Sequence, residues 1–138
     1  MNKDALAARL LAAFLEDLDE QLRTFNRELL ALEATPGDPE LLNRIFRAAH
    51  TLKGAARATG VAYVESACHA LEDLLSEARE GQRTLDASSF ATLFFAADAL
   101  VDVGDRLRRK QTLEGAPIAR LETRVRETIA HEGSADAP

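Results

Sequence analysis

Apolar residues recur along the chain at alternate steps of three and four, the spacing that places them on one face of a helix. Thr35-Pro36-Gly37, Gly60, Gly81 and a loop that reaches Gly115 interrupt this spacing. No segment alternates as a strand would, and no internal repeat is visible. We therefore predict helices over about residues 4–34, 38–59, 61–80, 87–111 and 117–131.

The helix ends carry residues that favour them. Asp38 can cap the second helix with Pro39 in its first turn, Asp86 can cap the fourth, and Gly60 tolerates the left-handed backbone of a helix end. On the fourth helix we predict that the inner face consists of Phe90, Phe94, Ala97, Val101, Gly104 and Leu107.

Apolar helices joined by short loops pack best side by side. The pattern predicts an all-α fold, an antiparallel up-and-down four-helix bundle with a fifth C-terminal helix over an end or a side. We expect one domain over residues 1–132, and a disordered tail or the start of a linker over residues 133–138.

Composition narrows the class of protein. With 46% hydrophobic and 29% charged residues in a chain of 138, the protein is globular and long enough for a real core. A net charge of −6 disfavours nucleic acid as a partner, and no apolar run or leader pattern indicates a membrane. The single cysteine, Cys68, lies on an apolar seam as a small core residue. We expect a cytoplasmic, monomeric domain.

One face of the second helix carries a strip of candidate functional residues. His50 lies one residue beyond the apolar seam, and Lys53 and Gly54 follow by three and four positions on the same face. A glycine inside a helix costs about 1 kcal/mol relative to alanine, so Gly54 indicates clearance for another molecule. An accessible imidazole can attack phosphorus, and lysine can neutralise phosphoryl oxygens. The strip indicates a phosphohistidine carrier; the alternative is a half-exposed histidine in a stable bundle.

The third helix brings further polar groups to this strip. Because only Gly60 separates the two helices, they form an antiparallel hairpin, and counting from the turn places His69 and Glu72 near His50. Glu72, which we expect to be an exposed carboxylate, would accept a hydrogen bond from Nδ1–H of His50 and leave Nε2 as the nucleophile. Lys53 would contact the phosphoryl group and His69 is a candidate for a further contact, while a surface Lys53–Glu72 ion pair and a bystander histidine stay open as alternatives.

The segment from His50 to Gly60, His-Thr-Leu-Lys-Gly-Ala-Ala-Arg-Ala-Thr-Gly, resembles the signature of histidine phosphotransfer (HPt) domains. The longer stretch 46–75 is similar to the N-terminal phosphotransfer domain of CheA-type chemotaxis histidine kinases. The resemblance implies that His50 is phosphorylated at Nε2 and that Glu72 orients and activates it. It also implies that Lys53 and His69 complete the network around the phosphoryl group.

The chain lacks the motifs of an ATP site. It contains no Walker loop, no paired-glycine phosphate cradle and no acidic metal triad. We therefore expect no cofactor or metal in this chain, which alone would be a phosphocarrier and would act as a histidine kinase only within a longer CheA-type protein. The resemblance implies that partner domains supply ATP and Mg²⁺. These partners are a CheA-type catalytic domain and CheY-like or CheB-like receivers.

The match departs from the CheA pattern at two positions near the hairpin turn. Thr59 stands where a bulky apolar residue is common, and Val61 stands where phenylalanine is common. These departures leave the specificity for a partner open, so an HPt intermediate of a hybrid-sensor relay remains an alternative.

Two other classes of function also remain open. A helical scaffold that presents an acidic helix to a partner would leave Gly54 unexplained. A metal site built from His50, His69 and Glu72 would have the positive charge of Lys53 beside the cation.

Overall fold

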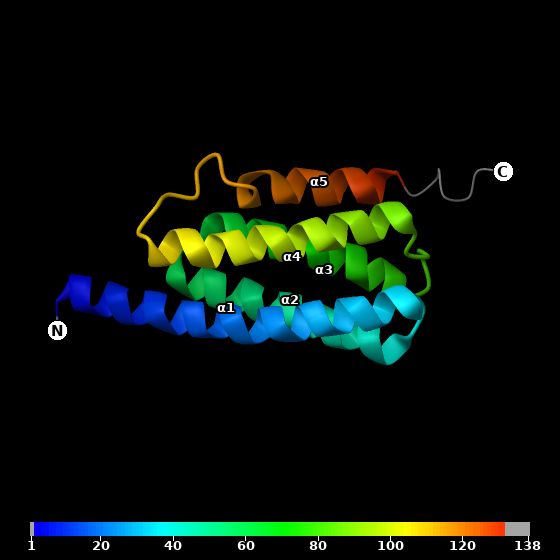
Figure 1. Ribbon diagram of the computed structural model, residues 1–138, viewed down its shortest axis with the longest axis horizontal. Coiled ribbons are helices and arrows are strands. Elements are labelled where there is room, and N and C mark those ends of the chain that lie inside the picture. Colours follow the sequence, from blue (N-terminus) through cyan, green and yellow to red (C-terminus); the bar gives the residue numbers. More distant parts are fainter. Residues whose placement is uncertain (1, 132–138) are drawn as a thin grey trace.

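The computed structural model describes residues 2–131, and in this range it contains helices and no strand. Consecutive helices run in opposite directions, so the first four form an antiparallel up-and-down bundle (Figure 1). This confirms the predicted all-α bundle, whereas the predicted tail at 133–138 lies outside the described residues. The helices are α1 (Lys3–Ala34), α2 (Pro39–Thr59), α3 (Ala62–Arg79), α4 (Ala87–Arg108) and α5 (Ile118–Ala130).

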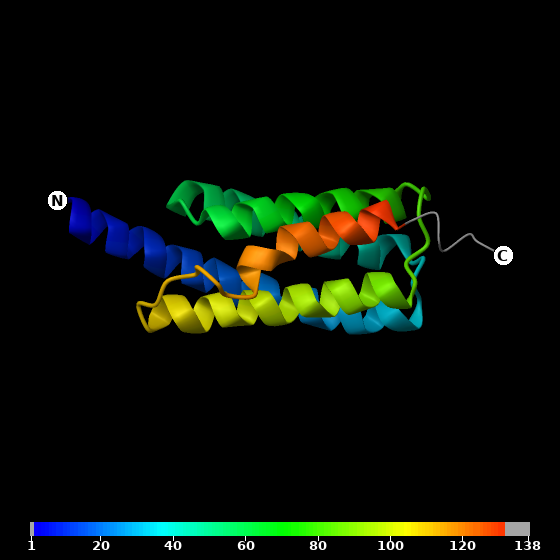
Figure 2. The same ribbon diagram turned by 90° about the horizontal axis from the view of Figure 1, so that it is seen from above.

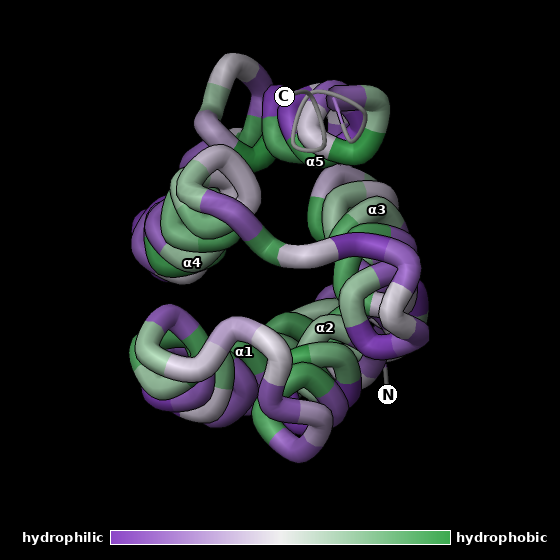
Figure 3. The backbone as a smooth tube through the Cα atoms, turned by 90° about the vertical axis from the view of Figure 1, so that its right-hand side faces the viewer, coloured by the Kyte–Doolittle hydropathy of each residue, from purple (hydrophilic) through white to green (hydrophobic). Residues whose placement is uncertain are grey.

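The fifth helix covers a side of the bundle. Seen from above, α5 lies along α3 and α4 and crosses from one toward the other (Figure 2). Its apolar residues Ile118, Leu121 and Val125 are buried, because they face the seam between those two helices. The end-on view shows α1 to α4 around one core with α5 above them (Figure 3).

The hydrophobic core explains why the helices associate. Each fully buried Leu or Phe side chain stabilises the fold by roughly 1.5–3 kcal/mol relative to exposure. The apolar residues that recur by threes and fours along the α2–α3 hairpin are buried, except Val61, which precedes α3 and is half-buried. Their burial fixes the rotation of both helices about their axes. The seam residues are Leu42, Ile45, Ala49, Leu52 and Ala56 on α2, and Val64, Cys68, Leu71, Leu75 and Ala78 on α3.

The predicted inner face of α4 was wrong at one position. Val101 is 45% exposed, whereas Leu93, Leu100 and Val103 are buried. The buried residues step by seven and three from Leu93, and Val101 falls one position off that line. The helix also ends at Arg108 rather than at 111, because Lys110 adopts a left-handed backbone with φ of 59° that a helix cannot contain.

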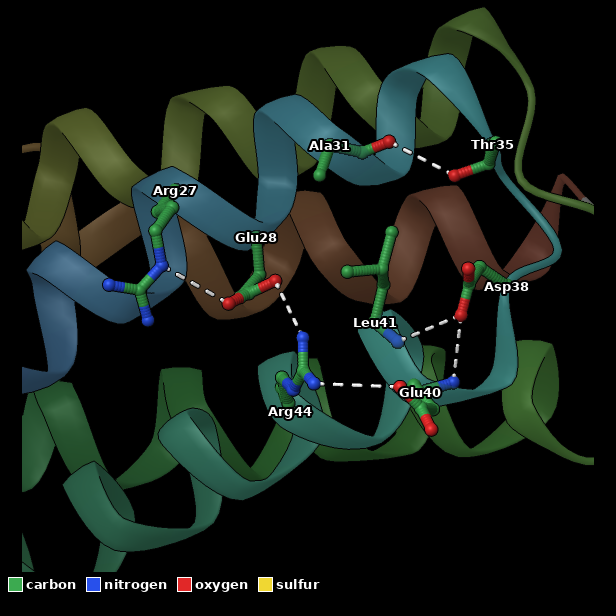
Figure 4. A network of polar contacts seen from close by, with 8 residues as sticks. All are labelled: Arg27, Glu28, Ala31, Thr35, Asp38, Glu40, Leu41 and Arg44. Atoms are coloured by element: carbon green, nitrogen blue, oxygen red, sulfur yellow. Dashed lines mark hydrogen bonds and ion pairs between the residues drawn. The ribbon is translucent and has the colours of Figure 1, made fainter.

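The helix ends confirm the predicted caps. The Asp38 carboxylate accepts hydrogen bonds from the backbone N–H groups of Glu40 at 2.9 Å and Leu41 at 3.2 Å (Figure 4). Asp86 likewise accepts from the N–H of Ser89 at 2.9 Å, and this bond lowers the pKa of its carboxyl group. The helices begin at Pro39, Ala62 and Ile118, one residue later than predicted, because Asp38, Val61 and Pro117 are the residues that precede the first turn.

A buried carboxylate sets the register of α1 against α2. Glu28 on α1 is buried, and its oxygens lie 3.2 Å from Nε of Arg27 and 3.6 Å from Nη1 of Arg44 on α2 (Figure 4). A buried carboxylate needs such partners, because losing water costs an ion several kcal/mol, so this contact disfavours sliding of one helix along the other.

One helix in the described range, α4, has the length and apolar composition of a membrane span, with a mean hydropathy of 1.3 over its most apolar window. That window is 56% buried inside the bundle. The composition of α4 therefore matches that of a core helix in a folded domain.

Candidate functional site

The α2–α3 hairpin builds the candidate site. Gly60 ends α2 in the left-handed backbone with φ of 79°, and the N–H of Val61 donates to the carbonyl of Ala56 at 2.9 Å. This tight turn returns the chain antiparallel, so that residues at equal distances before and after the turn face each other across the hairpin. His50 on α2 and Glu72 on α3, which are 22 residues apart in sequence, are such a pair.

Two side chains of α2 share one carboxylate of α3. Nδ1 of His50 lies 2.5 Å from Oε1 of Glu72, and Nζ of Lys53 lies 2.5 Å from Oε2. An ionised carboxylate can only accept, so the hydrogen bond requires the proton on Nδ1 of His50. In neutral imidazole this tautomer leaves the lone pair on Nε2.

The three side chains differ sharply in exposure. The side chain of Glu72 is 8% exposed, whereas that of His50 is 64% exposed and that of Lys53 is 30% exposed. Our expectation of an exposed carboxylate at Glu72 was therefore wrong. Glu72 lies at the interface of two helices, and the side chains of His50 and Lys53 bind both of its oxygens.

Electrostatics keep this buried carboxylate ionised. Loss of water alone would raise the pKa of Glu72, but the hydrogen bonds and positive charges of Lys53 and His50 outweigh that effect and lower it. The site at neutral pH therefore contains a fixed negative charge beneath an accessible imidazole.

The structure brings His69 and Gly54 to the same patch. A hollow beside the imidazole is lined by His50, Lys53, Gly54 and His69, and His69 is itself exposed. A Cβ placed on Gly54 would meet no atom within 4 Å apart from its own helix backbone and chain neighbours. Packing inside this domain therefore does not require glycine, and the space over Gly54 is open to another molecule.

The residues near the turn have structural contacts of their own. The hydroxyl of Thr59 donates to the carbonyl of Ala55 at 2.8 Å, and Val61 is half-buried against the core. Arg57 lies 3.9 Å from Glu65 across the hairpin at the rim of the same hollow. The departures at Thr59 and Val61 thus lie beyond Arg57, next to the surface that surrounds His50.

The arrangement does not form a metal site. Among residues 2–131, no group of three His, Cys, Asp or Glu side chains could hold a metal ion. The Lys53 ammonium binds the oxygen of Glu72 that a cation would need, and this geometry disfavours the metal alternative built from His50, His69 and Glu72.

Cys68 lies beneath the site as an unreactive core residue. It is fully buried on α3, and burial, together with the nearby charge of Glu72, raises the pKa of its thiol to about 12 against a small opposing effect of Lys53. The thiol therefore stays protonated at neutral pH and is a poor nucleophile.

Sequence reasoning missed two residues that contact the site. Phe46 stacks beside His50, and Arg79 from α3 lies over the ring of Phe46. The spacing of four residues between Phe46 and His50 was the available signal, since such positions are neighbours on a helix surface.

Comparison with known proteins identifies the family. The model of the Hpt domain matches residues 9–127. The chemotaxis protein CheA of Halobacterium salinarum is 38% identical over 90 residues, which are 65% of this chain and 14% of that protein. The CheA of Bacillus subtilis is 36% identical over 105 residues, 71% of this chain and 16% of that protein. The chain thus spans less than a fifth of the length of these relatives.

Solved structures agree with this assignment. The phosphorylated P1 domain of CheA3 in complex with CheY6 from R. sphaeroides superposes with a TM-score of 0.78 at 30% identity, covering 90% of this chain and 98% of that one. The CheA phosphotransferase domain from Thermotoga maritima gives a TM-score of 0.68 at 35% identity over 70% of this chain and 92% of that one. The chain belongs to the Hpt domain family.

Proposed function

We propose that this chain is the phosphohistidine carrier of a chemotaxis-type phosphorelay. His50 accepts a phosphoryl group from the ATP-bound catalytic domain of a CheA-type histidine kinase and passes it to an aspartate of a receiver domain. The observation that carries the proposal is the contact between buried Glu72 and Nδ1 of exposed His50, which leaves Nε2 free to react.

The proposed transfer has two steps. The Nε2 lone pair of His50 attacks the γ-phosphorus of ATP, a bond forms between nitrogen and phosphorus, and the bond to the leaving oxygen of ADP breaks. The ring becomes more positive as this happens, and Glu72 stabilises it through the Nδ1–H hydrogen bond. In the second step an aspartate oxygen of the receiver attacks the phosphorus, and the electrons of the N–P bond return to Nε2.

The other site residues have supporting roles in this proposal. Lys53 offsets the negative charge of the phosphoryl oxygens, and His69, which lines the same hollow, is a second contact for them. Gly54 leaves clearance for the active site of the partner. This chain acts as a carrier without an ATP site of its own, and the partner domains provide ATP and Mg²⁺.

Related proteins support the choice of partners. The P1 domain of CheA3 forms a complex with CheY6, so we propose a CheY-like or CheB-like receiver as the acceptor for this chain. Kinship with CheA proteins supports a CheA-type catalytic domain as the donor and a cytoplasmic location. We propose that the domain itself is a monomer that binds neither nucleic acid nor membrane.

An HPt intermediate of a hybrid-sensor relay is the second candidate, because it would use the same histidine chemistry. The repeated similarity to CheA proteins favours the chemotaxis-type kinase. A scaffold without chemistry is disfavoured, because it gives no reason for an unobstructed glycine beside an exposed histidine.

The test is transfer of labelled phosphate. Incubation with a CheA-type catalytic domain and labelled ATP should place an acid-labile, base-stable label on the chain. His50→Gln should abolish the label, and His131→Gln, at the end of α5, should keep it. A label retained by His50→Gln would overturn the assignment.

A further inference from the structure

The hydrogen bond to Glu72 fixes only one atom of the His50 ring. Nδ1 is held at 2.5 Å from the carboxylate, but the side chain is 64% exposed, and the last torsion of histidine has a broad energy well. The ring can therefore tilt about Nδ1 unless a second contact holds its plane. Any tilt moves Nε2, the atom on the far side of the ring.

Phe46 supplies a second contact on the same helix. Its ring centroid lies 6.4 Å from that of His50, and the two planes differ by 6°. This is the range of an offset-stacked aromatic pair. Phe46 is half-buried and packs against the hydrophobic core, so its own ring has less freedom than the imidazole.

The ring of Phe46 is itself held from α3. The guanidinium carbon of Arg79 lies 4.0 Å from the Phe46 centroid, within the range of a cation–π interaction. Nη1 of Arg79 also donates to Oδ1 of Asn43 on α2 at 3.3 Å. These contacts of Arg79, from the other helix of the hairpin, therefore restrict the motion of the Phe46 ring, which lies one helical turn from His50 on α2.

From this geometry we infer that Phe46, fastened by Arg79, is a positioning residue for phosphoryl transfer at His50. Glu72 sets the tautomer and the position of Nδ1, and Phe46 sets the plane of the ring and hence the direction of the Nε2 lone pair. A nucleophile that is already aligned before the partner domain binds reacts faster, even when the affinity for that partner is unchanged. The inference rests on the proposed function for its rate effect, whereas the effect on the ring plane can be measured independently.

The test compares Phe46 with Phe95. Both rings are half-buried beneath a guanidinium, but Phe46 stacks beside His50, whereas Phe95 lies on α4. Phe46→Leu keeps an apolar side chain and removes the planar ring, and Phe46→Tyr keeps the ring. Phe95→Leu is the matched control, because Phe95 is also half-buried and lies under a guanidinium, that of Arg124 at 4.4 Å. The measurements are kcat and KM for phosphorylation by a CheA-type catalytic domain, together with NMR of the His50 ring and its side-chain torsions.

The inference requires a specific pattern. Phe46→Leu should lower kcat about three- to tenfold, the scale of an off-rotamer side chain, with little change in KM. It should also broaden the distribution of the His50 torsions, while Phe46→Tyr and Phe95→Leu stay close to the unmodified protein. Equal kcat values for Phe46→Leu and Phe95→Leu, a change in KM alone, or unaltered His50 torsions in Phe46→Leu would overturn it. If the unmodified protein takes no label, the proposed function fails, and the torsions alone decide whether Phe46 orients the ring.

Discussion

Nζ of Lys53 lies 2.5 Å from Oε2 of Glu72, the carboxylate oxygen that the histidine does not use. The ammonium thereby helps to keep Glu72 ionised in a buried position, since its hydrogen bond and its charge both lower the pKa of that carboxyl group. Lys53 also lines the hollow beside the imidazole, so one cation serves both the carboxylate and the expected site of the phosphoryl group.

Replacement of Glu72 by glutamine should slow phosphorylation of His50 by at least about tenfold, because the amide can still accept from Nδ1–H but has no charge to offset the ring. Single-turnover labelling measures this rate. Glu65→Gln is the control, since Glu65 lines the same hollow but pairs with Arg57 at 3.9 Å. An unchanged rate in Glu72→Gln would remove the carboxylate from the mechanism.

The same carboxylate should contribute to stability in a pH-dependent way. The pKa of Glu72 in the folded chain lies below its ordinary value of 4.5, so its contribution is complete above about pH 4.5 and is lost as the pH falls through the lower folded value. The unfolding free energy of Glu72→Gln should therefore fall below that of the unmodified protein by about 1–3 kcal/mol at neutral pH, with the gap narrowing in acid. Urea denaturation at a series of pH values measures the gap. A gap that is constant down to about pH 2 would contradict the lowered pKa.

Replacement of Gly54 by alanine should raise the stability of the domain but slow phosphoryl transfer. The new methyl group meets no atom within 4 Å outside its own helix backbone and chain neighbours, so α2 should gain about 0.5–1 kcal/mol from helix propensity. Transfer to and from partner domains should slow, because the methyl group takes up the clearance over His50.

Gly104→Ala is the control for that experiment. A Cβ there would lie 3.0 Å from Nη1 of Arg108 and 3.4 Å from Cδ2 of Leu18, so the gain in stability should be smaller and labelling should not change. Thermal unfolding and transfer rates, measured for both variants, test the pair. Equal transfer rates for Gly54→Ala and the unmodified protein would mean that no partner approaches this point.

Replacement of Arg83 by methionine should loosen α5. The Arg83 side chain is 5% exposed, lies 3.1 Å from Glu77, and donates to the carbonyl of Ile129 at 2.7 Å near the end of α5. Its loss removes the donor from these part-buried acceptors, and we expect a cost of about 1–3 kcal/mol. Hydrogen exchange should show faster opening of α5 than of α2. Uniform exchange across the domain would indicate that the helix is held by its apolar face alone.

Much of the fold was predictable because its signals are local. The spacing of apolar residues, the caps at Asp38 and Asp86 and the left-handed Gly60 each act within a few residues of chain. The error at Val101 arose because α4 is apolar nearly all round, so its sequence does not show which face packs inward.

The site was predictable in part for a related reason. Register across a short hairpin follows from counting, and this places Glu72 and His69 beside His50. The burial of Glu72 and the position of Arg79 over Phe46 depend on how side chains of two helices interdigitate. Counting along a single helix carries no information on such contacts.

The turn at Gly60 makes the site unusually sensitive to the length of the chain. One residue inserted into the helical residues on either side of it, between His50 and Glu72, would turn these two side chains by about 100° relative to each other about the helix axis and carry the carboxylate away from the ring. The connection between α4 and α5 carries no such constraint, since neither helix supplies a group that hydrogen-bonds to His50. Homologous chains that keep this chemistry should therefore accept insertions and deletions between 109 and 117, and almost none at the turn between α2 and α3.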